Sequence, residues 1–129
     1  MAADPKSKII VIEDQDSIRE MMVEFLEVLG YESLEAVDQV SAKATVEQNA
    51  NDIGVIICDI VLGTANGPDL VKELAKWIPD AVVIYTSGFT TKDLFEKEST
   101  SSSLFLPKPF SMESLKSILE TAFSMVKTN

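Results

Sequence analysis

The stretch Val55-Ile56-Ile57-Cys58-Asp59 places a carboxylate directly after four apolar residues. Such a short, continuous apolar run is typical of a strand that is buried on both faces of a parallel sheet. Polar residues also follow the apolar runs at residues 9–12, 82–85 and 104–106. The strands of a parallel α/β sheet end at a common edge, where such folds bind their ligands. The pattern therefore predicts that the polar residues at these strand ends converge on one site: Glu13, Asp14, Asp59, Thr86 and Lys108.

Helical patterns separate these predicted strands along the chain. We expect helices over residues 17–29, 39–48, 68–78, 90–98 and 112–126, and a short second strand over 31–36. Alternating strands and helices favour a parallel sheet that is covered on both faces. The predicted fold is therefore α/β, a doubly wound, flavodoxin-like (βα)5 three-layer sandwich whose parallel sheet has the strand order 2-1-3-4-5. This order places the ends of the first and third strands side by side.

Individual residues mark where these helices should begin and end. Asp16 and Ser17 are the candidate N-caps of the first helix, and Gly30 is its expected stop. Asp38 is expected to cap the second helix, and Pro79 to end the third.

Length and composition limit what the chain can be. Its 129 residues, of which 46% are apolar, suit one compact domain, and we assign residues 8–127 to it and residues 1–7 to a flexible leader. No apolar stretch approaches the roughly 20 residues that cross a bilayer, and the N-terminus lacks the apolar core of a signal peptide. We therefore expect a cytoplasmic protein with no membrane partner.

Charge and residue usage exclude several kinds of function. The net charge of −10 should repel nucleic-acid backbones, so we expect no nucleic-acid binding by this domain. The chain has no histidine, which excludes histidine metal ligands and a phosphohistidine of its own. The single Cys58 cannot form an internal disulfide, and we interpret it as a small buried apolar residue.

Three clustered carboxylates repel one another unless a cation neutralises them. Oxygen ligands without histidine or cysteine favour Mg²⁺, with Mn²⁺ as the alternative. Beside such an ion Asp59 can attack a phosphoryl group to give an acyl phosphate, while Lys108 and Thr86 share the charge that develops on the phosphoryl oxygens.

These motifs resemble those of a two-component response-regulator receiver domain, either a single-domain regulator or the receiver of a hybrid histidine kinase. The resemblance covers residues 8–127 in order. It consists of Glu13-Asp14 after the first strand, Asp59 after the third, Gly67 eight residues later, Thr86 after the fourth and Lys108-Pro109-Phe110 after the fifth.

The resemblance implies a phosphorylation-activated signalling switch in a phosphorelay. In that family pattern Asp59 accepts a phosphoryl group from a phosphohistidine donor, and Mg²⁺ is held by Glu13, Asp14, Asp59 and the backbone carbonyl of Val61. Lys108 pairs with the phosphoryl group, Thr86 moves to bond it, and Phe105 is the switch aromatic. The Lys108–Pro109 peptide bond is implied to be cis.

Partners follow from the same resemblance. The donor would be a sensor histidine kinase or a histidine phosphotransfer protein, and a downstream protein target would bind the face from the fourth strand to the fifth helix. The domain would be no enzyme beyond catalysing its own phosphorylation and slow dephosphorylation.

Three other functions remain open at this stage. A Mg²⁺-dependent phosphatase with an aspartyl nucleophile would have a second Asp two residues after Asp59, where this chain has Val61. A flavin or nucleotide binder would have a Ser/Thr/Gly-rich loop after the first strand, but three of the four residues at 13–16 are acidic and would repel a phosphate. A protein-interaction module on the same fold that works without phosphate would not require Asp59, Thr86 and Lys108, and the presence of all three argues against it.

Overall fold

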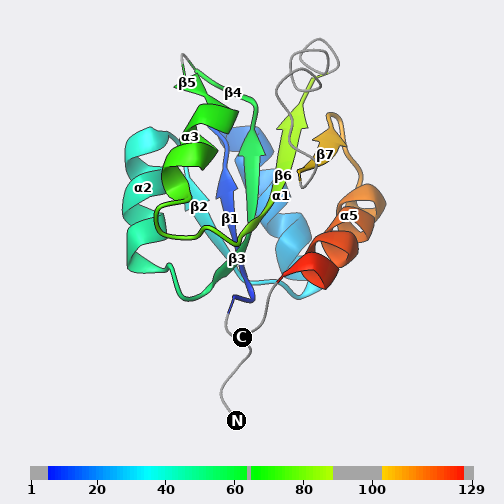
Figure 1. Ribbon diagram of the computed structural model, residues 1–129. Coiled ribbons are helices and arrows are strands. Elements are labelled where there is room, and N and C mark those ends of the chain that lie inside the picture. The colour runs from blue at the N-terminus through cyan, green and yellow to red at the C-terminus, as the bar shows by residue number, and fades with distance from the viewer. Residues whose placement is uncertain (1–5, 64, 89–102, 127–129) are drawn as a thin grey trace.

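The computed structural model describes residues 6–63, 65–88 and 103–126. Five strands form one sheet in the order β2-β1-β3-β6-β7, and all neighbouring pairs are parallel (Figure 1). Counted within this sheet alone, that is the order 2-1-3-4-5, so the predicted doubly wound fold is confirmed. The strands are β1 (Lys8–Ile12), β2 (Ser33–Ala36), β3 (Ile53–Asp59), β6 (Val82–Ser87) and β7 (Leu104–Pro107).

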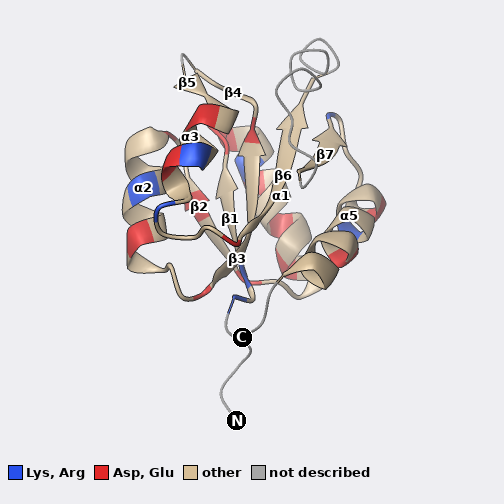
Figure 2. Cartoon of the chain, viewed as in Figure 1, with Lys and Arg blue, Asp and Glu red and all other residues tan. Residues whose placement is uncertain are grey.

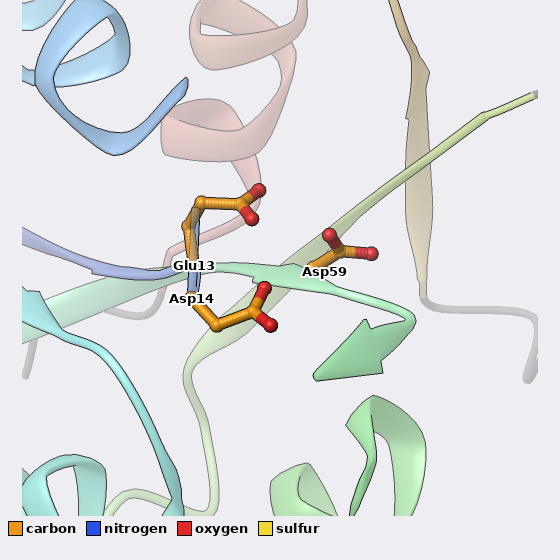
Figure 3. A group of neighbouring side chains, drawn as sticks. All are labelled: Glu13, Asp14 and Asp59. Carbon is orange, nitrogen blue, oxygen red and sulfur yellow. The ribbon is translucent and has the colours of Figure 1, made fainter. Parts of the chain in front are cut away.

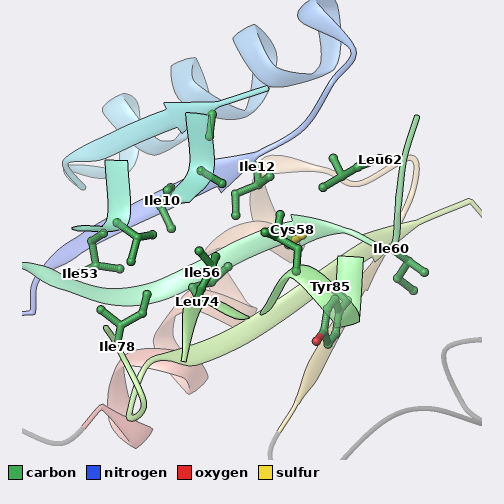
Figure 4. Close-up of a cluster of buried hydrophobic side chains, with 14 residues drawn as sticks. Ile10, Ile12, Ile53, Ile56, Cys58, Ile60, Leu62, Leu74, Ile78 and Tyr85 are labelled. Atoms are coloured by element: carbon green, nitrogen blue, oxygen red, sulfur yellow. The ribbon is translucent and has the colours of Figure 1, made fainter. Parts of the chain in front are cut away.

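Helices pack on both faces of the sheet and bury two apolar clusters. On one face, α2 (Gln39–Gln48) and α3 (Gly67–Leu74) cover the cluster drawn in Figure 4. On the other face, α1 (Asp16–Leu29) and α5 (Met112–Met125) cover the second cluster. The central strand β3 is buried along its whole length, as its apolar sequence predicts. Cys58 is fully buried in the first cluster.

Between β3 and α3 the chain forms a small antiparallel hairpin that the sequence analysis did not predict. Its strands are β4 (Val61–Leu62) and β5 (Ala65–Asn66), and they pair only with each other. The hairpin lies directly beyond the carboxyl end of β3 (Figure 1), and its first residue, Val61, lines the cleft of the site described below.

Two predicted helix ends are wrong. Helix α1 begins one residue earlier than its candidate caps allow: Gln15 is the N-cap, without a side-chain cap bond, and the Asp16 carboxylate instead accepts a hydrogen bond from Arg19. Helix α3 ends at Leu74 and not before Pro79. After Leu74 the backbone tightens, so that the amide of Trp77 donates to the carbonyl three residues earlier.

The other ends agree with the sequence. Gly30 closes α1 in the left-handed conformation, with φ of 91°, and Asp38 caps α2 by accepting from the amide of Ser41. Ser111 caps α5 in the same way through Ser114. The second strand is shorter than expected and begins at Ser33. The predicted helix at 90–98 and most of the serine run at 99–103 lie outside the described residues.

Among the described residues, none of the helices combines the length and the apolar character needed to span a bilayer.

Candidate functional site

A lysine and two carboxylates from three strand ends form the centre of the site. Lys108 Nζ lies 2.7 Å from Asp59 Oδ2 and 3.0 Å from Glu13 Oε1, so the ammonium group donates to both acids. Asp59 is the last residue of β3, Glu13 follows β1, and Lys108 follows β7. Residues 13 and 108 are far apart in sequence, and the parallel sheet brings them together as the strand-end pattern predicted.

Asp14 completes a group of three acids (Figure 3). One carboxylate oxygen from each of Glu13, Asp14 and Asp59 lies within 4.8 Å of the others. Glu13 and Asp59 are buried, at 4% and 7% exposure, whereas Asp14 is exposed. Asp14 and Asp59 open into a cleft of about 430 Å³, whose lining residues are Asp14, Gln15, Ile18, Asp59, Val61, Gly63, Gly88 and Lys108. Carboxylate oxygens at this spacing and on one side of a cleft fit a hard divalent cation.

The backbone around Asp59 holds its carboxylate in place. The Val61 amide donates to Asp59 Oδ1 at 3.0 Å, and the Ile60 amide donates to the carbonyl of Thr86 on the neighbouring strand. The Gly67 amide donates to the carbonyl of Ile60 at 2.6 Å. A Cβ atom at Gly67 would overlap the carbonyl oxygen of Asp59, so only glycine allows this close approach.

Burial and charge shift the pKa values of the buried groups. Burial raises the pKa of Glu13 above its usual 4.5, and the charge of Asp59 adds to the effect, although hydrogen bonds from Lys108 and the Gln15 amide offset part of it. Burial alone would lower the pKa of Lys108, but the hydrogen bonds to Asp59 and Glu13 outweigh it and raise that pKa. Lys108 is therefore a cation at neutral pH, and it partly neutralises the acids.

Thr86 and Phe105 lie on adjacent strands but on opposite faces of the sheet. Thr86 is buried and pairs in register with Asp59, so it lies at the same edge of the sheet as the Asp59 carboxylate. Phe105 pairs with Tyr85 and is only half-buried against the α2 and α3 cluster. Since side chains alternate along a strand, Phe105 points away from the face that Thr86 occupies.

The peptide bond between Lys108 and Pro109 is cis, which is the isomer that the resemblance implies.

The sequence analysis missed one residue of this region. Arg19, in the first turns of α1, donates from Nη1 to the carbonyl oxygen of Glu13 at 3.0 Å. Its other nitrogens bind Asp16 Oδ1 at 2.7 Å and Glu35 Oε1 at 3.2 Å. The available signal was compositional: Arg19 is the single arginine of the chain, and it lies close to the acidic segment 13–16.

Comparison of the amino-acid sequence with known proteins identifies the family of this chain. The family model described as the response regulator receiver domain matches residues 9–120. The sensor kinase CckA of Brucella abortus (strain 2308) is 33% identical over 109 residues, which cover 83% of this chain and 11% of CckA. The transcriptional regulator NtrC of Azospirillum brasilense is 30% identical over 117 residues, which cover 90% of this chain and 24% of NtrC. The chain thus spans a small part of these curated relatives.

Solved structures agree with the sequence comparison. A response regulator receiver domain protein from Clostridium thermocellum superposes with a TM-score of 0.83 at 27% identity, over 92% of this chain and 94% of that one. The receiver domain of the hybrid histidine kinase CckA superposes with a TM-score of 0.75 at 29% identity, over 89% of this chain and 97% of that one. The matched span, the strand order and the acids at the strand ends lead to one conclusion: the chain belongs to the response regulator receiver domain family.

Proposed function

We propose that this receiver domain accepts a phosphoryl group on Asp59 from a phosphohistidine donor in a Mg²⁺-dependent reaction, and that the acyl phosphate switches its interactions. The observation that carries the proposal is the Lys108 ammonium group, which bonds the carboxylates of Asp59 and Glu13 at the edge of an open cleft. An acid held between a fixed cation and a backbone donor is positioned for nucleophilic attack on phosphorus.

In the proposed reaction a carboxylate oxygen of Asp59 forms a bond to phosphorus while the bond between phosphorus and the donor's imidazole nitrogen breaks. Lys108 moves from the carboxylates to a phosphoryl oxygen, and the Thr86 hydroxyl donates to another. The chain's ligands for Mg²⁺ would be Glu13, Asp14, Asp59 and the Val61 carbonyl. Bound there, the ion supplies charge neutralisation for the acids and the incoming phosphoryl group.

The remaining roles rest on the family. We assign Phe105 the part of the switch aromatic that is coupled to Thr86, although the register places the two side chains on opposite faces of the sheet. The donor would be a sensor histidine kinase or a histidine phosphotransfer protein in the cytoplasm, and the target would bind the β6 to α5 side. Residues 8–127 would form the functional unit.

Incubation with acetyl phosphate and Mg²⁺, followed by intact mass measurement, tests the proposal. The wild type should gain one phosphoryl group, and Asp59→Asn should gain none because the nucleophile is lost. Asp52→Asn is a matched control, since Asp52 is an exposed acid at the opposite end of β3 that pairs with Lys8. Labelling of Asp59→Asn to the wild-type extent would refute the assignment of Asp59.

A further inference from the structure

Arg19 connects three elements at the edge of the site. Its guanidinium group binds the backbone carbonyl of Glu13 at the end of β1, the carboxylate of Asp16 on α1 and that of Glu35 on β2. The Arg19 side chain is only 12% exposed, whereas its two carboxylate partners are 77% and 49% exposed. An arginine fork that uses three nitrogens on three partners is held in one geometry.

The Glu13 carbonyl belongs to the peptide group that leads into Asp14. The amide of Glu13 is bound by the carbonyl of Ala36, so with Arg19 in place both backbone groups of Glu13 are fixed. The Glu13 carboxylate has its own partners in Lys108 and the Gln15 amide. Asp14 is exposed, and the direction of its side chain depends on the peptide plane that Arg19 holds.

We propose that Arg19 is a positioning residue, which orients the Glu13–Asp14 peptide so that both carboxylates face Asp59 and can bind a divalent cation. This inference rests on the proposed role of the three acids as metal ligands. Arg19 acts through the backbone of Glu13 and does not itself touch the phosphoryl group.

The direction in which the Mg²⁺ affinity changes when Arg19 is removed distinguishes a positioning role from a purely electrostatic effect of its charge. A fixed cation near a Mg²⁺ site repels the ion, so removal of Arg19 should tighten Mg²⁺ binding if only its charge mattered. Loss of a residue that orients metal ligands should weaken binding, typically by about tenfold.

The experiment is calorimetric titration with Mg²⁺ alone, without a phosphodonor. Arg19→Met removes the charge and the donors but keeps the apolar stem, and Arg19→Lys keeps the charge but loses the fork. We expect the Kd for Mg²⁺ to rise about tenfold in Arg19→Met and by a smaller factor in Arg19→Lys. Lys43→Met is the matched control, because it removes a lysine that pairs with Glu73 on the α2 and α3 side, away from the site. Its Kd should equal that of the wild type.

A second readout needs no metal. Because Arg19 polarises the carbonyl of the Glu13–Asp14 peptide, the Asp14 amide nitrogen resonance of the metal-free protein should shift in both Arg19 variants and not in Lys43→Met. Unchanged or tighter Mg²⁺ binding in folded Arg19→Met would overturn the inference. If that variant fails to fold, unchanged binding in Arg19→Lys would overturn it.

The outcome for Asp14→Asn separates this inference from the proposed function. If the wild type binds Mg²⁺ and Asp14→Asn does not, the metal site stands whatever Arg19 does. If Asp14→Asn binds as the wild type does, the ligand assignment fails first.

Discussion

At the scale of single residues, the three acids of the site are not equivalent. Glu13 and Asp59 are buried and share Lys108, whereas Asp14 is exposed. The raised pKa of Glu13 shows that the metal-free protein keeps the Glu13 carboxylate charged at a cost in free energy. Replacing different acids should therefore change stability in different ways.

We expect Asp14→Asn to raise the stability of the metal-free protein by up to about 1 kcal/mol, because it removes a like charge without breaking an ion pair with Lys108. Asp59→Asn removes a charge as well but also breaks the 2.7 Å contact with Lys108, so its gain should be smaller. Urea unfolding in EDTA measures both. A larger gain for Asp59→Asn would show that the Lys108 contact stabilises little.

The lifetime of the acyl phosphate should depend on two residues that line the cleft. Val61 and Gly88 offer no side-chain group that could orient an attacking water molecule, so we expect slow autodephosphorylation. Val61→Asn and Gly88→Glu should each speed the loss several-fold. A Cβ at Gly88 would meet no atom within 4 Å, so the backbone leaves room for a side chain to begin at this position.

Loss of the phosphoryl group is followed by intact mass after removal of the donor. Val40→Asn, which changes an exposed valine on α2, serves as the control. Rates equal to that of the wild type in both cleft variants would mean that these positions do not set the lifetime.

The convergence of the acids with Lys108 could be predicted from the sequence because it follows from strand ends and sheet order alone. The contact of Lys108 with Glu13 and the bonds of Arg19 could not, since each depends on side-chain conformations and on the spacing of elements to within an ångström. Asp16 lies at the i,i+3 helical spacing from Arg19, but no sequence pattern links Arg19 to its partners at positions 13 and 35.

At the scale of elements, the helices and the strands of the main sheet were predictable, but the two-residue strands of the hairpin were not. The hairpin of β4 and β5 has two residues in each strand, too few for an alternating pattern to appear in the sequence. The start of α1 was misplaced because Asp16 binds Arg19 and does not cap the helix. Capping preferences describe Asp16 by its residue type alone. In the structure the Arg19 side chain binds the Asp16 carboxylate, which therefore does not accept from a backbone amide of α1.

Capping should contribute measurably to α5. Ser111 accepts from the Ser114 amide at 3.0 Å, so Ser111→Ala should lower the free energy of unfolding by about 1 kcal/mol. Ser117→Ala, an exposed serine within the same helix, is the control and should be neutral or slightly stabilising. Equal effects of the two changes in chemical denaturation would argue against the cap.

At the scale of the whole molecule, negative charge dominates. The chain carries 21 acidic and 11 basic residues, and Figure 2 shows acidic residues, in red, on each of the labelled helices. Repulsion among them disfavours the compact state, most of all where the acids of the site meet. Both a bound cation and a bound proton should therefore stabilise the fold.

Stability of the metal-free protein should rise as the pH falls from 7 towards 4.5, the pKa of Glu13 in the unfolded chain. The folded-state pKa of Glu13 lies above its unfolded value of 4.5, so ionisation of Glu13 costs stability, and this cost disappears as the pH falls through the folded pKa. Asp38 acts in the opposite sense, because its lowered pKa gives stability that is lost only below 3.8. Melting temperatures in EDTA measure the trend, and Glu13→Gln should flatten it. An equal rise in that variant would assign the effect to other acids.

The position of Trp77 has a spectroscopic consequence. Trp77 packs near Ile53, the first residue of β3, while Asp59 is the last residue of that strand, about 20 Å away. The only indole chromophore of the chain therefore reports on the end of the domain opposite to the chemistry. Its emission should follow unfolding with little interference from ions or phosphoryl groups, so one fluorescence trace can follow folding while mass or magnetic resonance follows the site.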